Sequence, residues 1–198
     1  MAPPIQPEPL ILASQSPRRR QLLLEAGYRF EVVEPKLGEP DWVHPHLGPA
    51  MHVESLAYFK ARSVAADHLD QTILAADTIA VVDGRIVGKP RDLDDARNIL
   101  NALSGKAHSV ITGVVLLHAA SGRRMLQHNI TTVRFRTLTQ EMLEAYLRTR
   151  RWEGKAGAYG AQDQDDPFAL SITGSFTNVV GLPMELLTQM FGHWMGTG

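Results

Sequence analysis

The residues best suited to chemistry begin near the N-terminus, where an apolar run over 10–13 is followed by Ser14, Ser16, Pro17 and three arginines at 18–20. The pattern predicts a buried strand that leads directly into a helix, with Ser16 as the N-cap and Pro17 as the first helical residue. A helix N-terminus has unpaired N–H groups and a partial positive charge. Together with the hydroxyl and guanidinium groups, it favours an anion, above all a polyphosphate. An ordinary capped surface helix with solvated arginines is the alternative.

Asp77 is a second candidate, because apolar residues flank it on both sides, at 73–76 and at 79–82. A buried carboxylate without a partner is costly, so Asp77 needs hydrogen bonds, a cation or a metal ion. A structural aspartate that bonds to the backbone in a β-bulge is the alternative.

Two lysines are further candidates. Lys60 belongs to a helix predicted over about 52–68, where a solvated helix lysine is the simplest interpretation. Lys89 lies in Gly88-Lys89-Pro90, which resembles the end of a phosphate-binding loop but lacks the earlier glycine and the following Ser or Thr of a P-loop. Hydrolysis of a phosphoanhydride would need such cations on the phosphates, a metal held by carboxylates and a base for the water.

The rest of the chain predicts alternating strands and helices that would position these groups. Strands are expected at 30–33, 85–87, 109–118, in a partner ending near 135, and at 171–173; helices are expected after Asp92, over 140–147 and over 184–191. One loop, over 34–49, contains Glu34, Glu39 and Asp41. A second, over 150–162, combines charged and small residues and suits a substrate-facing segment.

Composition limits the classes of function. The chain has 198 residues, a formal net charge of -1 and 44% hydrophobic residues, which predicts a soluble globular protein with no basic excess for nucleic acid. Cysteine is absent, which excludes thiol nucleophiles and thiolate metal sites and is compatible with the cytoplasm. No apolar stretch approaches a membrane span. We expect a flexible lead-in over 1–8 and a single domain over 9–198.

Several short motifs occur in order along nearly the whole chain. They are Ala13-Ser14-Gln15-Ser16-Pro17-Arg18-Arg19, Ala76-Asp77-Thr78, Gly88-Lys89-Pro90, Leu103-Ser104-Gly105 with His108, Thr112-Gly113-Val114, Lys155-Ala156-Gly157-Ala158-Tyr159 with Gln162, Gly174-Ser175-Phe176 and Asn178-Val179-Val180-Gly181-Leu182-Pro183. Each motif is weak alone, but together they make the chain resemble the Maf family of nucleoside triphosphate pyrophosphatases.

This resemblance implies a mixed α/β fold of the Maf and ITPase-like kind, with a curved central sheet, flanking helices and two lobes around a substrate cleft. It implies hydrolysis of a nucleoside triphosphate to the monophosphate and pyrophosphate with Mg²⁺ or Mn²⁺. It also implies a homodimer that acts in the cytoplasm, with no nucleic-acid or membrane partner.

The resemblance also assigns roles to residues. Asp77 matches the family's general base or metal-positioning carboxylate, and Lys60 and Lys89 match its phosphate-contacting lysines. Ser14 and Arg19 match the phosphate cradle. The positions linked to nucleobase choice are Arg18, Thr78 and Gln162. Glu39 matches the second metal-side carboxylate, with Glu34 and Asp41 as alternatives.

The threonine after Asp77, together with Gln162, resembles the branch of the family that acts on dTTP and UTP. Modified pyrimidine nucleotides are further candidate substrates. Residues 163–166 depart from the glycine that many relatives have there. Two alternatives stay open: a pyrophosphatase for 7-methyl-GTP, and a nucleotide-binding regulator of cell division and septum formation that needs no turnover.

Overall fold

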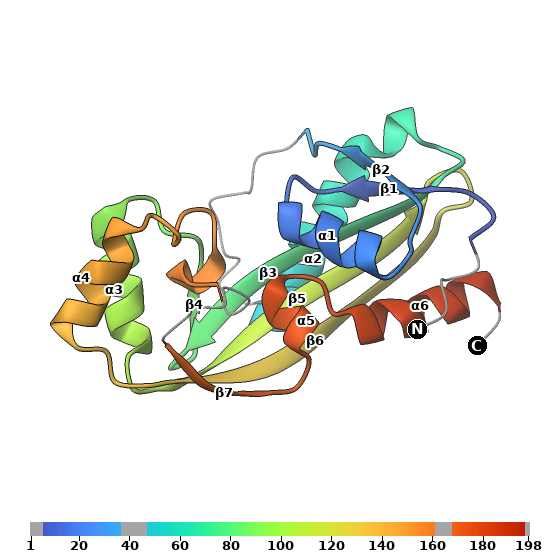
Figure 1. Cartoon of the computed structure of the whole chain (residues 1–198). Coiled ribbons are helices and arrows are strands. Elements are labelled where there is room, and N and C mark those ends of the chain that lie inside the picture. The colour runs from blue at the N-terminus through green and yellow to red at the C-terminus, as the bar shows by residue number, and fades with distance from the viewer. Residues whose placement is uncertain (1–5, 37–46, 161–167, 197–198) are drawn as a thin grey trace.

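A computed structural model describes residues 6–36, 47–160 and 168–196, and its centre is a seven-stranded mixed sheet (Figure 1). The strands are β1 (Leu10–Ala13), β2 (Phe30–Val33), β3 (Thr72–Val82), β4 (Arg85–Val87), β5 (Ala107–His118), β6 (Arg123–Phe135) and β7 (Ala169–Thr173). Their order is β2-β1-β3-β5-β6-β7, with β4 paired to β3. The pairs of β1 with β2 and with β3 are parallel, and the other pairs are antiparallel. This confirms the mixed α/β class.

Helices cover both faces of this sheet. They are α1 (Pro17–Glu25), α2 (Pro49–Val64), α3 (Leu93–Leu103), α4 (Gln140–Arg148), α5 (Phe176–Val180) and α6 (Met184–Met195), with short 3₁₀ turns at Ala65–Asp67 and Ala156–Ala158. In Figure 1, α2 lies behind the long strands, α5 and α6 lie in front, and α3 and α4 sit together at the far end. Within the described ranges, no helix has both the length and the apolar character needed to cross a bilayer.

Alternation along the strands explains this layering. Leu10 and Leu12 of β1 pack with Leu23 of α1 and with the apolar side of α6. Ile11 and Ala13 point the other way and pack against α2. Because successive strand residues face opposite sides, a continuous apolar run such as β1 must be covered on both faces.

A second lobe is built around the ends of β5 and β6. Val110, Val133 and Phe135 of these strands pack with the apolar sides of α3 and α4. The Asp95 N–H donates to the side chain of Asp92 at the start of α3, and the Met142 N–H donates to the Thr139 side chain at the start of α4.

Several boundaries differ from prediction. The two apolar runs around Asp77 form one uninterrupted strand, and the ladder from Thr72 to Val81 runs without a shift against β5. The bulge interpretation of Asp77 is therefore wrong. Helix α2 begins earlier, at Pro49, because proline fits a first helical turn. The five-residue α5 is too short to leave a helical periodicity in the sequence.

Candidate active site

The candidate site is a cavity of about 990 Å³ between the two lobes. It is lined by the β1–α1 turn, the middle of β3, the β4–α3 connection, the loop at 153–160 and the α5–α6 connection. Its described lining includes six cationic side chains, Arg18, Arg19, Lys36, Lys60, Lys89 and Lys155, and three carboxylates, Glu34, Asp77 and Glu153. The excess of cations suits a strongly anionic ligand.

The β1–α1 turn supplies the start of this site. Ser16 precedes α1 in extended conformation and Pro17 is the first helical residue, as predicted, but the Ser16 side chain makes no capping bond. The Ser16 N–H instead donates to the Ser14 hydroxyl at 3.2 Å. With no side-chain cap at this helix end, the positive end of the helix faces the cavity.

Arg19 connects three distant segments. Its Nε donates to the Gly181 carbonyl at 2.8 Å, one terminal nitrogen donates to the Ser14 hydroxyl at 3.2 Å, and the other donates to the Thr78 hydroxyl at 3.0 Å. The Thr78 hydroxyl also lies 2.9 Å from that of Thr112. Arg19 is therefore buried and braced, while Arg20 beside it is exposed.

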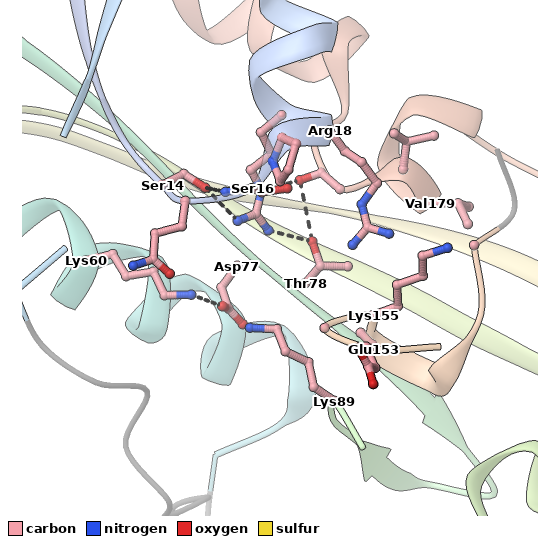
Figure 2. A pocket seen from close by; sticks show the side chains of 18 of the residues that line it. Ser14, Ser16, Arg18, Lys60, Asp77, Thr78, Lys89, Glu153, Lys155 and Val179 are labelled. Carbon is pink, nitrogen blue, oxygen red and sulfur yellow. Dashed lines mark hydrogen bonds and ion pairs between the residues drawn. The ribbon is translucent and has the colours of Figure 1, made fainter. Parts of the chain in front are cut away.

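Asp77 and Lys60 form a buried ion pair in the middle of the site. The side chains of Lys60 and Asp77 are only 13% and 7% exposed, so the interpretation of Lys60 as a solvated helix lysine is wrong. Figure 2 shows Lys60 and Lys89 directed at the Asp77 carboxylate from opposite sides. Lys60, Lys89 and Asp77 together form a compact end of the cavity with an excess of positive charge.

The approach of α2 to the sheet makes the ion pair possible. Gly113 of β5 lies opposite Asp77, and a Cβ at Gly113 would come within 2.6 Å of the Val53 backbone on α2. Only a glycine allows this contact. Lys60 follows Val53 by two helical turns and thus reaches the middle of β3.

All the described site residues predicted from the sequence come together here: Ser14, Arg18, Arg19, Lys60, Asp77, Thr78 and Lys89. Gln162, Glu39 and Asp41 lie outside the described residues. Glu34, one of the alternatives, lines the cavity, and its carboxylate accepts a hydrogen bond from the Gln15 side chain.

Sequence reasoning missed Lys155 and Glu153 as individual residues, although it identified their loop as substrate-facing. It also missed an apolar wall of the cavity formed by Val110, Ala156, Val179 and Val180. The signals for Lys155 and Glu153 were the charged and small residues of the 150–162 loop and, for Lys155, the motif that it begins.

The donor set fits a hard divalent cation. Asp77 and Glu34 bring carboxylate oxygens to the cavity, and Mg²⁺ is usually held by one or two carboxylates together with phosphate and water oxygens. Among the described residues, no cluster of three or more His, Asp or Glu side chains could hold a metal by itself.

A buried histidine lies beneath the 155–160 loop. His108 Nε2 and the Tyr159 hydroxyl are hydrogen-bonded at 2.8 Å, and the His108 ring packs edge-on against Phe135. Burial lowers the pKa of His108 to about 4, because the apolar surroundings disfavour the charged form. His108 is therefore neutral at physiological pH.

Comparisons with known proteins find relatives along nearly the whole chain. The profile of a family described as Maf-like protein matches residues 9–194. A dTTP/UTP pyrophosphatase of Moorella thermoacetica is 44% identical over 186 residues, which are 92% of this chain and 95% of that protein. A dTTP/UTP pyrophosphatase of Symbiobacterium thermophilum is 43% identical over 192 residues, which are 96% of this chain and 97% of that protein. A solved HAM1 protein from Coxiella burnetii aligns with a TM-score of 0.41 at 15% identity, over 64% of this chain and 72% of that one.

Proposed function

Because the chain belongs to the Maf family, we propose that it is a nucleoside triphosphate pyrophosphatase that prefers dTTP and UTP. The products are the nucleoside monophosphate and pyrophosphate. The observation that carries the proposal is the ion pair of a buried carboxylate, Asp77, with Lys60, together with Lys89 directed at the same carboxylate, inside a cavity where cations outnumber carboxylates.

In the proposed reaction, water attacks the α-phosphorus. Asp77 orients the water and accepts its proton, as a positioned general base does. The bond from the α-phosphorus to the bridging oxygen breaks, and its electron pair leaves with pyrophosphate. Lys60 and Lys89 offset the negative charge that develops on this leaving group, and Ser14 with the α1 N-terminus binds the neighbouring phosphate oxygens.

Mg²⁺ or Mn²⁺ belongs to the proposal. Asp77 would hold the ion together with a second carboxylate, for which Glu39, Glu34 and Asp41 are the candidates. When bound, the ion would neutralise charge on the substrate phosphates. The absence of cysteine in the chain also favours these oxygen-preferring metals over a thiolate zinc site.

The test is pyrophosphate release and product chromatography across a nucleotide panel. We expect monophosphate and pyrophosphate, with kcat/KM for dTTP and UTP above that for dCTP and for the purine nucleotides. Diphosphate and orthophosphate as main products would refute the reaction. A preference for 7-methyl-GTP would overturn the branch, and tight nucleotide binding without turnover would favour the regulator of division.

The proposal includes a homodimer that acts in the cytoplasm. The chain mass is 21.9 kDa, so light scattering of the purified protein should give about twice this value. A mass equal to that of one chain would contradict the dimer and leave the reaction untouched.

A further inference from the structure

The cavity has two chemically different ends. The first contains the Asp77–Lys60 pair, with Lys89 directed at the same carboxylate. The second is the side where Val179 lies, and the apolar residues that line the cavity are Val110, Ala156, Val179 and Val180. Figure 2 shows Val179 and Lys155 on the side away from Lys60. A triphosphate at the first end would therefore direct its nucleoside toward the second.

Three separate segments build the apolar end. Asn178 Nδ2 donates to the Val110 carbonyl at 2.9 Å, which places α5 beside β5. Ala80 is the ladder partner of Val110, and a Cβ at Gly157 would lie 3.3 Å from the Ala80 Cβ. The 155–160 loop, β5 and α5 therefore meet around one apolar surface, which suits the flat face of a nucleobase.

Two cations stand at the rim of this surface. Figure 2 shows the Arg18 and Lys155 side chains converging from α1 and from the 155–160 loop. Thr78, whose hydroxyl is held by Arg19 and Thr112, lines the cavity as well. Hydrogen-bond donors thus surround an apolar floor.

The backbone around Lys155 is anchored on both sides. The Gly157 N–H donates to the Gly88 carbonyl at 3.1 Å, and Gly157 has a φ of +73°, which favours glycine. The Tyr159 hydroxyl is hydrogen-bonded to the buried His108. On the other side, the Lys155 N–H donates to the Trp152 carbonyl at 3.3 Å. These contacts hold the lysine at a defined place on the rim.

We propose that Lys155 is a specificity-determining residue that, with Arg18, donates hydrogen bonds to the carbonyl oxygens of a pyrimidine base lying on the apolar wall. This inference rests on the proposed function. Uracil and thymine have two carbonyl oxygens, whereas cytosine replaces one of them with an amino group. A lysine ammonium can only donate, so it forms a hydrogen bond with a carbonyl oxygen but meets a second donor where the base has an amino group. Lys155 therefore selects bases with two carbonyls and disfavours cytosine.

The test is Lys155→Met, which keeps the side-chain stem and removes the donor. A hydrogen bond to a charged group corresponds to about tenfold or more in affinity, so the ratio of kcat/KM for dTTP over dCTP should fall by at least about tenfold. Lys155→Arg keeps a cationic donor and should retain most of the preference. Lys106→Met is the matched control, because Lys106 pairs with Asp83 on the surface outside the cavity, and it should leave the ratio unchanged.

Two kinetic results would overturn the assignment. An equal fall in kcat/KM for every nucleotide in Lys155→Met would indicate that Lys155 contacts the phosphates. An unchanged ratio of kcat/KM for dTTP over dCTP would show that Lys155 does not select the base. Titration with dTMP and dCMP, which lack the reacting bond, separates this inference from the proposed reaction. Wild type should bind dTMP more tightly, and Lys155→Met should lose that difference; equal binding by wild type would contradict base selection here. Failure of the reaction itself would appear only as missing pyrophosphate release from dTTP by wild type.

Discussion

Asp77 and Gly113 are paired across the β3–β5 ladder, so the carboxylate of the site lies opposite a glycine at which α2 approaches the sheet closely. The missing side chain of Gly113 brings the helix close, and the helix brings Lys60 to Asp77. A residue that contacts no substrate thereby determines the geometry of the ion pair.

Gly113→Ala should disturb both stability and activity. Its Cβ would lie 2.6 Å from the Val53 backbone, so α2 must shift, at a cost of about 1–3 kcal/mol in the free energy of unfolding. Denaturant unfolding and pyrophosphate release would measure the two effects. Gly192→Ala on α6 is the control, because a Cβ there meets nothing within 4 Å, and it should be neutral or slightly stabilising. Equal behaviour of the two variants would contradict the close approach.

Asp77→Asn should fold and still bind nucleotide, because the amide keeps the size and much of the hydrogen bonding of the carboxylate. Its melting temperature should fall below that of wild type, because the buried Lys60 loses its ion-pair partner. Turnover should fall about a hundredfold to ten-thousandfold, as expected for loss of a general base. Thermal melting, nucleotide titration and pyrophosphate release, measured on one preparation, would distinguish a catalytic role of Asp77 from a structural one. Asp83→Asn, which removes a surface carboxylate paired with Lys106, should leave all three unchanged. Substantial turnover by Asp77→Asn would make Asp77 structural and move the base to the 34–41 segment.

Chelation should abolish activity. Carboxylate oxygens suit Mg²⁺ and Mn²⁺, so EDTA should stop pyrophosphate release and either ion should restore it. The melting temperature in EDTA without nucleotide provides a control, because loss of activity through unfolding would appear as a lower value. Full activity after thorough chelation would exclude the metal from the reaction.

Acid should weaken the fold through His108. The unfolded histidine takes up a proton below about pH 6.5, whereas burial lowers the pKa of folded His108 to about 4. Between these values the unfolded state binds more protons, so stability falls as the pH falls, by up to about 3 kcal/mol from this group. Chemical unfolding of wild type and His108→Gln at several pH values from 7 to 4 would measure this pH dependence of the free energy of unfolding. The variant should have the shallower dependence, and parallel curves would contradict the assignment.

Local patterns in the sequence were enough to predict the β1–α1 turn, because its cap, proline and apolar run lie within a few residues of one another. The need of Asp77 for a partner followed equally from its apolar neighbours. The partner itself could not be predicted, since Lys60 is 17 residues away and its reach depends on the tertiary contact at Gly113.

Lys155 escaped prediction for a related reason. Its place in the cavity depends on hydrogen bonds of Gly157 to Gly88 and of Tyr159 to His108, each between segments distant in the sequence. The apolar wall combines Val110 with Val179, which no periodicity connects. The sequence thus predicts the chemistry of single segments, whereas the cavity arises from packing between them.

The hydrogen bond from Arg19 to the Gly181 carbonyl also has a consequence for biosynthesis. Its acceptor, the Gly181 carbonyl, lies 162 residues downstream. At a translation rate of about 5–20 residues per second, the arginine leaves the peptidyl-transferase centre roughly 10–30 seconds before glycine is added. The anion site of a nascent chain therefore lacks the Arg19–Gly181 hydrogen bond until Gly181 has been added, and a ribosome-bound intermediate shorter than this should not yet hold a nucleotide as the folded protein does.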